Sequence, residues 1–281
     1  MANQLSPQKL EQLKAKAQWV WNQTLLLHKR APETRVASSL SDVETFVCLY
    51  YGDLLQYDPK NPRWEGRDRF VISKGHGSIS MYPILADCGF FPLEELERIC
   101  TAGSFLGGIP DPIIPGYETI NGSLGHGLGV ASGMALGQKN KGDDRDVLVL
   151  VGDGELSEGS NWEAIMFAAH HGLDNLTLII DDNGIGMLDL SVNILNWTPI
   201  KAKLDTFGWE VFEVDGHDIE QLHPTLAQAK SQRKGKPKVV IAKTIKGRGT
   251  SIENHPLSHI LMVKADEVDR LVDQDGALQW G

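Results

Sequence analysis

The chain has 281 residues, of which 27 are Lys or Arg and 37 are Asp or Glu, so its formal net charge at pH 7 is −10. This acidic balance argues against a general nucleic-acid binder, because such proteins need a basic surface to hold the phosphate backbone. No apolar run approaches the roughly 18 residues that a membrane-spanning helix requires.

The cysteines and the first residues of the chain predict a cytoplasmic protein. Cys48, Cys88 and Cys100 are odd in number and widely spaced, which favours reduced thiols over a disulfide framework or a zinc site. Residues 1–7 lead into a polar, lysine-bearing stretch and lack the apolar core of a secretion signal. We therefore expect no nucleic-acid and no membrane partner.

The first 116 residues predict several helices around one short strand. Ser6 followed by proline is a typical helix start, and the apolar spacing continues the helix to about Lys29. The spacing of Ser41 and Glu44 is that of a capping box and predicts a second helix from Ser41. The elements that follow are a strand at 70–73, helices at 78–89 and 93–102, and an irregular loop rich in Pro and Gly at 103–116.

The rest of the chain alternates strands with helices. Ser160 and Glu163 form another capping box, which predicts a helix that ends at Gly172. The other expected elements are a helix at about 124–140 and strands at 147–151, 176–180, 209–214 and 238–242. Short apolar strands of this kind are typical of a parallel sheet that is covered on both faces. We predict one three-layer α/β/α domain over residues 1–281, with a mainly parallel sheet of five or six strands.

Polar residues follow two of the expected strands at the point where each strand ends. The run 147–151 stops at Gly152–Glu155, and the run 176–180 stops at Asp181–Ile185. In open α/β sheets ligands sit beyond the carboxyl ends of the strands, where these two clusters would meet. A carboxylate from Asp153, an amide oxygen from Asn183 and a main-chain carbonyl suit Mg²⁺ or Ca²⁺ and leave positions for phosphate oxygens. The alternative is that both side chains merely form turns or N-caps.

Six glycines between residues 122 and 137 are more than an ordinary helix tolerates, since each costs roughly 1 kcal/mol relative to alanine. Glycine allows a backbone to approach a ligand closely, and a helix N-terminus accepts phosphate. We therefore place Gly122, Leu124 and Gly125 on the ligand side. Residues Gly129–Gly137 are expected to serve close helix packing.

The spacing from Gly152–Gly154 to Asn183 resembles the signature of thiamine diphosphate enzymes, in which an aspartate and an asparagine hold the metal. Along nearly its whole length the chain also resembles the N-terminal section of transketolase. The matching segments, in chain order, are Asp58–Pro62, Arg67–Gly77, Gly122–Gly127, Gly152–Gly159, Asp181–Ile185 and Lys243–Gly247. The resemblance implies the thiamine diphosphate-binding fold, with the diphosphate and its metal bound by this domain.

The resemblance also assigns roles to individual residues. It implies that Asp153, Asn183 and the carbonyl of Ile185 bind Mg²⁺, with Ca²⁺ or Mn²⁺ as alternatives. His76 and His259 match catalytic histidines that contact the diphosphate and the reacting carbonyl side. Residues expected to contact thiamine diphosphate are His76, Gly122, Leu124, Gly125, Gly152, Gly154, Glu155, Asn183 and His259. Glu158, the third residue with an expected catalytic role, matches a glutamate at the subunit interface that links paired active sites.

The chain departs from the family pattern at two positions. Arg35 and Ile109 stand where transketolases have histidines that contact the sugar. Arginine suits carboxylate, phosphate or sulfonate recognition, whereas isoleucine cannot form a hydrogen bond with a hydroxyl group. These two substrate-shaping residues predict a donor other than an ordinary ketose phosphate, such as a less hydroxylated acyl unit, a 2-oxo acid or an unusual sugar.

The resemblance implies transfer of a two-carbon ketol unit from a ketose or related donor to an aldehyde acceptor. Transketolases continue into a pyrimidine-binding domain and a C-terminal domain, whereas this sequence ends at Gly281. We therefore expect a partner subunit that carries those domains, in an α₂β₂ assembly with the cofactor at the interface. One alternative is a carboligase or 2-oxo acid decarboxylating component that delivers an acyl unit to a non-sugar acceptor. The other is a non-catalytic cofactor-binding subunit.

Overall fold

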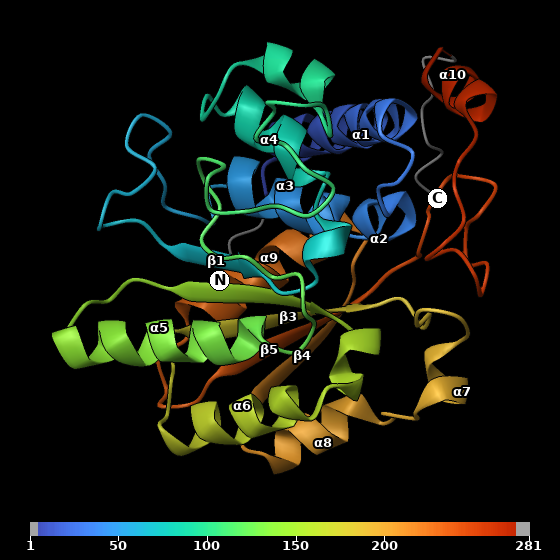
Figure 1. Cartoon of the computed structure of the whole chain (residues 1–281). Coiled ribbons are helices and arrows are strands. Elements are labelled where there is room, and N and C mark those ends of the chain that lie inside the picture. The colour runs from blue at the N-terminus through green and yellow to red at the C-terminus, as the bar shows by residue number, and fades with distance from the viewer. Residues whose placement is uncertain (1–4, 274–281) are drawn as a thin grey trace.

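Five parallel strands form the central sheet of the computed structural model, which describes residues 5–273 (Figure 1). The expectation of a polar start to the chain falls mainly on residues 1–4, which lie outside the described residues. The strands lie side by side in the order β1-β2-β3-β5-β4. Their bounds are β1 (Arg69–Ile72), β2 (Val147–Gly152), β3 (Leu176–Asp182), β4 (Glu210–Asp215) and β5 (Lys238–Lys243). The prediction of a parallel sheet of five or six strands is confirmed.

Helices cover both faces of this sheet, as expected for a three-layer fold (Figure 1). One face carries α1 (Pro7–Arg30), α2 (Val36–Leu40), α3 (Val43–Tyr51), α4 (Met81–Asp87) and α9 (Ile219–Ser231). The other carries α5 (Gly127–Lys141), α6 (Gly159–His170) and α8 (Ile200–Thr206). The remaining elements are α7 (Ser191–Ile194), α10 (Ala265–Asp273) and the 3₁₀ turns Gly75–Gly77, Leu93–Arg98 and Gly154–Ser157. Among residues 5–273, no helix has both the length and the apolar character needed to cross a membrane.

The strands are buried because their side chains alternate between two apolar layers. All six residues of β2 are buried. Leu148 and Leu150 belong to the core beneath α1, α3 and α4, whereas Val147, Val149 and Val151 belong to the core against α5 and α6. Successive strand residues point to opposite faces, so an unbroken apolar run is what a doubly covered strand requires.

Local helix-start signals were right at the N-terminus and wrong at two later positions. Ser6 caps α1, since its Oγ accepts a hydrogen bond from Lys9 N at 3.2 Å. Ser41 does not cap α3; its Oγ donates to Asp181 Oδ2 at 2.8 Å. Ser160 likewise donates to the carbonyl of Gly125 at 2.8 Å and does not cap α6. Both serines that the local pattern predicted to cap helices thus form hydrogen bonds with residues that are distant in sequence.

Two further local predictions need correction. The helix expected at 93–102 is a 3₁₀ turn over Leu93–Arg98. Gly129, Gly133 and Gly137 do not serve close packing within the chain, because a Cβ placed on any of them would meet no atom of the described residues within 4 Å. These three glycines lie on the exposed side of α5.

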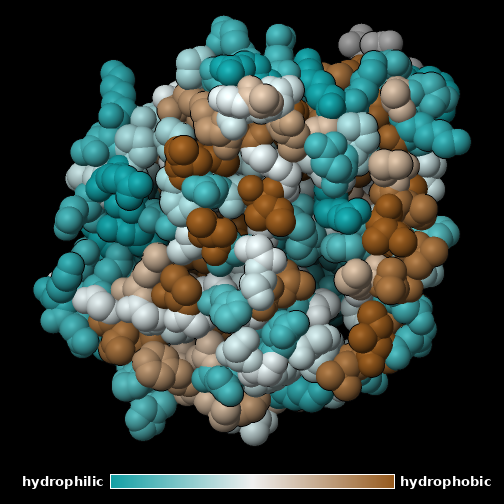
Figure 2. Space-filling view, viewed as in Figure 1, coloured by the Kyte–Doolittle hydropathy of each residue, from teal (hydrophilic) through white to brown (hydrophobic). Residues whose placement is uncertain are grey.

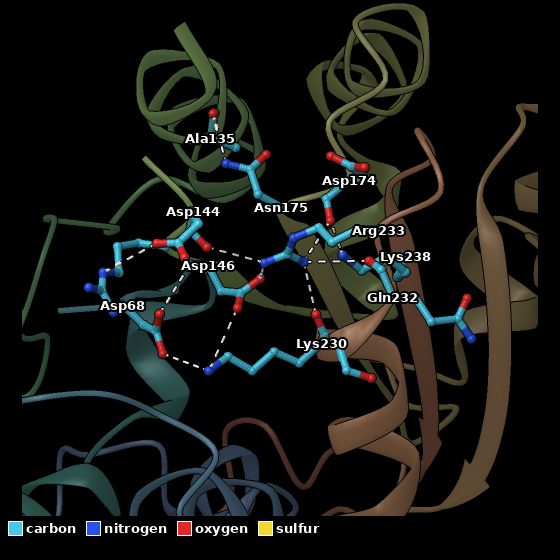
Figure 3. Close-up of polar contacts among 12 residues, drawn as sticks. Asp68, Ala135, Asp144, Asp146, Asp174, Asn175, Lys230, Gln232, Arg233 and Lys238 are labelled. Carbon is cyan, nitrogen blue, oxygen red and sulfur yellow. Dashed lines mark hydrogen bonds and ion pairs between the residues drawn. The ribbon is translucent and has the colours of Figure 1, made fainter. Parts of the chain in front are cut away.

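A charged cluster joins the amino ends of the strands to the end of α9 (Figure 3). Lys230 Nζ lies 2.8 Å from Asp68 Oδ2 and 3.7 Å from Asp146 Oδ2. Arg233 pairs with Asp146 at 2.6 Å, and Asp68 Oδ1 also accepts a hydrogen bond from the backbone nitrogen of Asp146. The cluster therefore stabilises the edge of the sheet opposite the carboxyl ends.

The stability of the domain should depend on the fully buried side chains of β3. We expect Ile179→Ala, at a position with 0% exposure, to lower the free energy of unfolding by about 2–5 kcal/mol, because it leaves a cavity between the sheet and the helices. Ile120→Ala is the matched control, since Ile120 is 62% exposed and its loss should stay within about 0.5 kcal/mol. Urea titration measures both, and equal losses would contradict this account of the core.

Candidate functional site

A cavity of about 390 Å³ lies at the carboxyl ends of the strands, the edge at which ligands bind in open parallel sheets. Register brings the strand ends together here, since Gly152 pairs with Asp181 and Asp182 pairs with Lys243. The lining residues are Ser38, Lys74, His76, Gly122, Leu124, Gly152, Asp153, Gly154, Glu155, Ser157, Glu158, Asn183, Ile185, Gly186, Met187, Ser191, Ile194, Trp197, Lys246 and His259. The cavity thus collects segments that follow β1, β2, β3 and β5.

Most residues expected at the site from the sequence line this cavity, and three do not. Gly125 is buried outside the cavity lining, and its backbone nitrogen donates a hydrogen bond to Glu155 Oε1 at 2.8 Å. Ile109 is 48% exposed and lies against Gly75, beside His76. Arg35 is exposed at the start of α2, yet its charge acts on both His76 and His259. Arg35 and Ile109 therefore lie near the two histidines but outside the lining of the cavity.

Two of the proposed metal ligands, Asp153 and Ile185, are buried and Asn183 is half-buried, and hydrogen bonds hold the side chains of Asp153 and Asn183. Asp153 Oδ2 accepts from Ser191 Oγ at 2.6 Å and from Gly184 N at 3.1 Å. Burial raises the pKa of Asp153 to about 6, although the hydrogen bond from Ser191 acts in the opposite direction. Asn183 Oδ1 accepts from Ile185 N at 3.1 Å. A carboxylate, an amide oxygen and a carbonyl are a donor set that suits a hard divalent cation.

This mixed donor set differs from a cluster of ionisable ligands. Within residues 5–273, no group of three or more His, Cys, Asp or Glu side chains is arranged to hold a metal ion. A metal held by Asp153 would use the Asn183 amide oxygen and the Ile185 carbonyl as well, with oxygens from a ligand at the remaining positions.

Glu155 lines the cavity, but both of its carboxylate oxygens accept hydrogen bonds from other residues of the chain. Oε1 accepts hydrogen bonds from Ser73 Oγ and from Gly125 N, and Oε2 accepts from Gly152 N at 3.3 Å. Glu155 therefore holds the 122–127 loop against the end of β2. Its direct contact with a cofactor stays a prediction, as does the interface role of Glu158, which is exposed beside the cavity.

The two predicted histidines meet across the cavity from distant parts of the chain. The ring centroids of His76 and His259 are 4.9 Å apart, with an angle of 69° between the ring planes. Burial lowers the pKa of His76 to about 3 and that of His259 to about 4, and the nearby charges of Lys74, Lys246 and Arg35 act in the same direction. Both rings are therefore neutral at pH 7, so each can donate one hydrogen bond and accept another.

The sequence reasoning missed two lysines, Lys74 and Lys246, that line the cavity. Lys246 Nζ donates to the carbonyl oxygens of Ile185 and Gly186 at 3.0 and 3.1 Å. Burial, with the charge of Lys74 in addition, lowers the pKa of Lys246 to about 8. Lys74 is buried and pairs with Asp42 and Asp181. Each lysine lies within three residues of a strand end, in a segment that already matched the family pattern, and this position was the signal that the sequence offered.

Comparison with known proteins agrees with this geometry. The family described as "Transketolase, thiamine diphosphate binding domain" matches residues 37–278. The chain belongs to the transketolase family. It is 40% identical to an apulose-4-phosphate transketolase subunit from Actinobacillus succinogenes, over 94% of this chain and 96% of that protein. It is 37% identical to the 6-deoxy-6-sulfo-D-fructose transketolase subunit SqwG of Clostridium sp., over 83% of this chain and 84% of that protein.

The solved transketolase from Campylobacter jejuni shares the fold, with a TM-score of 0.84 and 29% identity over 99% of this chain. The chain spans 44% of that transketolase, whereas it spans nearly all of the subunit from A. succinogenes. The chain thus corresponds to nearly the whole of a protein named as a transketolase subunit, but to less than half of the solved transketolase.

The two buried histidines should make stability depend on pH. Their folded pKa values of about 3 and about 4 lie below the ordinary 6.5, so between those limits the unfolded chain binds protons that the folded chain does not. Stability is therefore lost as pH falls. We expect His76→Gln/His259→Gln to lose less stability than the wild type between pH 7 and pH 5, by on the order of 1 kcal/mol per histidine.

Denaturant titrations at several pH values measure this difference. The matched control is His170→Gln/His171→Gln, since both side chains lie at the end of α6, away from the cavity; it should follow the wild-type slope. If removing His76 and His259 leaves the slope unchanged, the assignment of two neutral buried imidazoles is wrong.

Proposed function

We propose that this chain is the diphosphate-binding subunit of a heteromeric, thiamine diphosphate-dependent transketolase-like enzyme. It would transfer a two-carbon ketol unit from a ketose or related donor to an aldehyde acceptor. The observation that carries the proposal is the cavity at the carboxyl ends of the strands, where the oxygen donors of Asp153, Asn183 and Ile185 face two lysines and two neutral histidines. That combination suits a diphosphate together with a hard cation.

Each group has a role that its chemistry supports. Asp153, Asn183 and the Ile185 carbonyl would hold Mg²⁺, with Ca²⁺ or Mn²⁺ as alternatives, because their oxygens match hard cations. Lys246 brings a buried ammonium to the same wall and would counter the diphosphate charge. As neutral imidazoles, His76 and His259 can each donate a hydrogen bond to the diphosphate or to the reacting carbonyl side. The cofactor, when bound, supplies the stabilised carbanion that permits cleavage and formation of carbon–carbon bonds.

A partner subunit with the pyrimidine-binding and C-terminal domains completes the proposed enzyme, as an α₂β₂ assembly. Two observations support it: relatives of about this length are named as transketolase subunits, and the chain spans 44% of a solved transketolase. Exposed Glu158 at the cavity rim would lie toward that interface.

Co-expression of the chain with a neighbouring open reading frame that resembles the rest of transketolase tests the proposal. With thiamine diphosphate and Mg²⁺, we expect the pair to turn over a donor from a panel of ketose phosphates, unusual sugars and 2-oxo acids, and neither chain alone to turn over any of them. Asp153→Ala in the co-expressed pair should abolish turnover and cofactor binding, because the metal loses its charged ligand. A pair that binds cofactor without turning over any donor would favour the non-catalytic alternative, and failure to form a pair would overturn the proposal.

The donor is proposed to be an unusual sugar or a 2-oxo acid, because Arg35 and Ile109 replace histidines beside the catalytic pair. Arg35 acts electrostatically on both His76 and His259, which places its charge near the reacting end. The named relatives concern apulose 4-phosphate and a sulfonated fructose, both uncommon sugars. Release of CO₂ from pyruvate-type donors, without ketol transfer to an aldehyde acceptor, would instead favour the carboligase or decarboxylating alternative.

Restoring the two histidines should move the donor preference. For Arg35→His/Ile109→His we expect the ratio of kcat/KM for xylulose 5-phosphate to that for the native donor to rise on the order of tenfold, since one recovered hydrogen bond contributes about 1–3 kcal/mol. Arg63→His/Ile113→His makes the same changes at two exposed positions and should leave the ratio unaltered, since Arg63, unlike Arg35, is not among the charges that lower the pKa values of His76 and His259. If the kcat/KM ratio of Arg35→His/Ile109→His equals that of the wild type, Arg35 and Ile109 do not determine the donor preference.

A further inference from the structure

Asp181 is a buried carboxylate at the end of β3 that the proposed chemistry does not use. Its side chain is 1% exposed. Oδ2 accepts hydrogen bonds from Asn183 Nδ2 at 2.9 Å, from Ser41 Oγ at 2.8 Å and from Lys74 Nζ, while Oδ1 accepts from Thr244 Oγ1. The donors come from four segments: the α2–α3 junction and the residues that follow β1, β3 and β5. Asp181 therefore joins most of the segments that surround the cavity.

The contact with Asn183 decides which end of that amide faces the site. An ionised carboxylate only accepts hydrogen bonds, so it attracts the NH₂ end of an amide and repels the oxygen end. Asn183 accordingly directs Nδ2 to Asp181, and its Oδ1 lies on the side of the Ile185 backbone, where it accepts from Ile185 N. The amide oxygen therefore lies beside the backbone of Ile185, the residue whose carbonyl is another of the proposed metal ligands.

The Lys74–Asp181 pair is not explained by stability alone. Lys74 is 4% exposed in its side chain, lies 2.6 Å from Asp42 and also donates to the carbonyl of Ser38 at 3.2 Å. Removing two charges from water is expensive, and apolar residues of similar volume often stabilise a protein equally well. A pair of this kind is best understood through what it orients, and the residue that it orients here is Asn183.

The geometry points to Asp181 as a positioning residue that holds the Asn183 amide with its oxygen toward the metal. This inference rests on the proposed function, since it presupposes that Asn183 binds a metal. Lys74, Ser41 and Thr244 hold Asp181 from three sides and so fix the carboxylate that fixes the amide. Outer partners that orient a metal ligand typically change metal affinity 10- to 100-fold when they are removed.

Asp181→Asn tests the inference because an amide can present either a donor or an acceptor to Asn183. We expect the dissociation constant for Mn²⁺, titrated into the co-expressed pair with thiamine diphosphate and followed by EPR of the free ion, to rise 10- to 100-fold. Asp182→Asn is the matched control. Asp182 is the next residue of β3, also acts on Asp153 through its charge, and pairs with Lys243. The control should shift the constant much less.

A double variant separates positioning from a loss of fold. Asp181→Asn leaves Lys74 with less counter-charge, so its melting temperature is measured without metal. Lys74→Met/Asp181→Asn removes both charges, and Asp42, whose pKa burial raises well above its ordinary value, can then stay protonated. This variant should recover much of the melting temperature while Mn²⁺ binding stays weak. If Mn²⁺ affinity recovers together with the melting temperature, or if Asp181→Asn behaves like Asp182→Asn, the inference is wrong. Failure of the wild type to bind Mn²⁺ with thiamine diphosphate would instead overturn the proposed function, and this inference with it.

Discussion

The parallel register of β1, β2, β3 and β5 is the constraint on which the rest of the molecule depends. Because these strands run in one direction, their carboxyl ends share one edge, and the polar residues after each strand meet there. The cavity is the direct result: its lining comes from segments more than 200 residues apart in sequence, from Ser38 to His259. No single segment contains the site.

The charges of the domain are divided between the two edges of this sheet. At the amino ends, Lys230 and Arg233 are matched by Asp68 and Asp146, so that edge is closed by its own ion pairs (Figure 3). At the carboxyl ends, Lys246 interacts with backbone carbonyl oxygens and also lines the cavity. The ion pairs at the amino ends stabilise the fold. At the carboxyl ends, the ammonium group of Lys246 stays available to an anionic ligand.

Apolar side chains surround this edge of the sheet. Met187, Leu188, Ile194 and Leu195 are at least half exposed on the segment beside α7, and Met262 is 58% exposed near His259. Figure 2 shows hydrophobic surface along this side of the molecule, next to a hollow. Exposed apolar surface of this extent is typical of an interaction site, and it agrees with the partner subunit proposed for the enzyme.

Sequence patterns failed where a residue had a partner far away along the chain. Ser41 and Glu44 have the spacing of a capping box, yet Ser41 donates to Asp181 and Glu44 pairs with Arg248 at 2.6 Å. A capping-box rule considers only residues that are close in sequence. It therefore cannot predict that Asp181 and Arg248 become the partners of these two side chains. The predicted packing role of Gly129–Gly137 was wrong for a related reason, because the sequence does not show which side of a helix is covered.

The sequence by itself determined the strands, the doubly covered sheet and the metal-ligand candidates, because apolar runs and the residues after them are local features. It also located Asp153, Asn183, His76 and His259, through motifs that tertiary contact then brought to one cavity. Only the tertiary structure decided that Glu155 braces the glycine loop, that Lys246 lies at the Ile185 carbonyl, and that Asp181 orients Asn183. Those roles depend on distances between segments, and distances of that kind are set by packing.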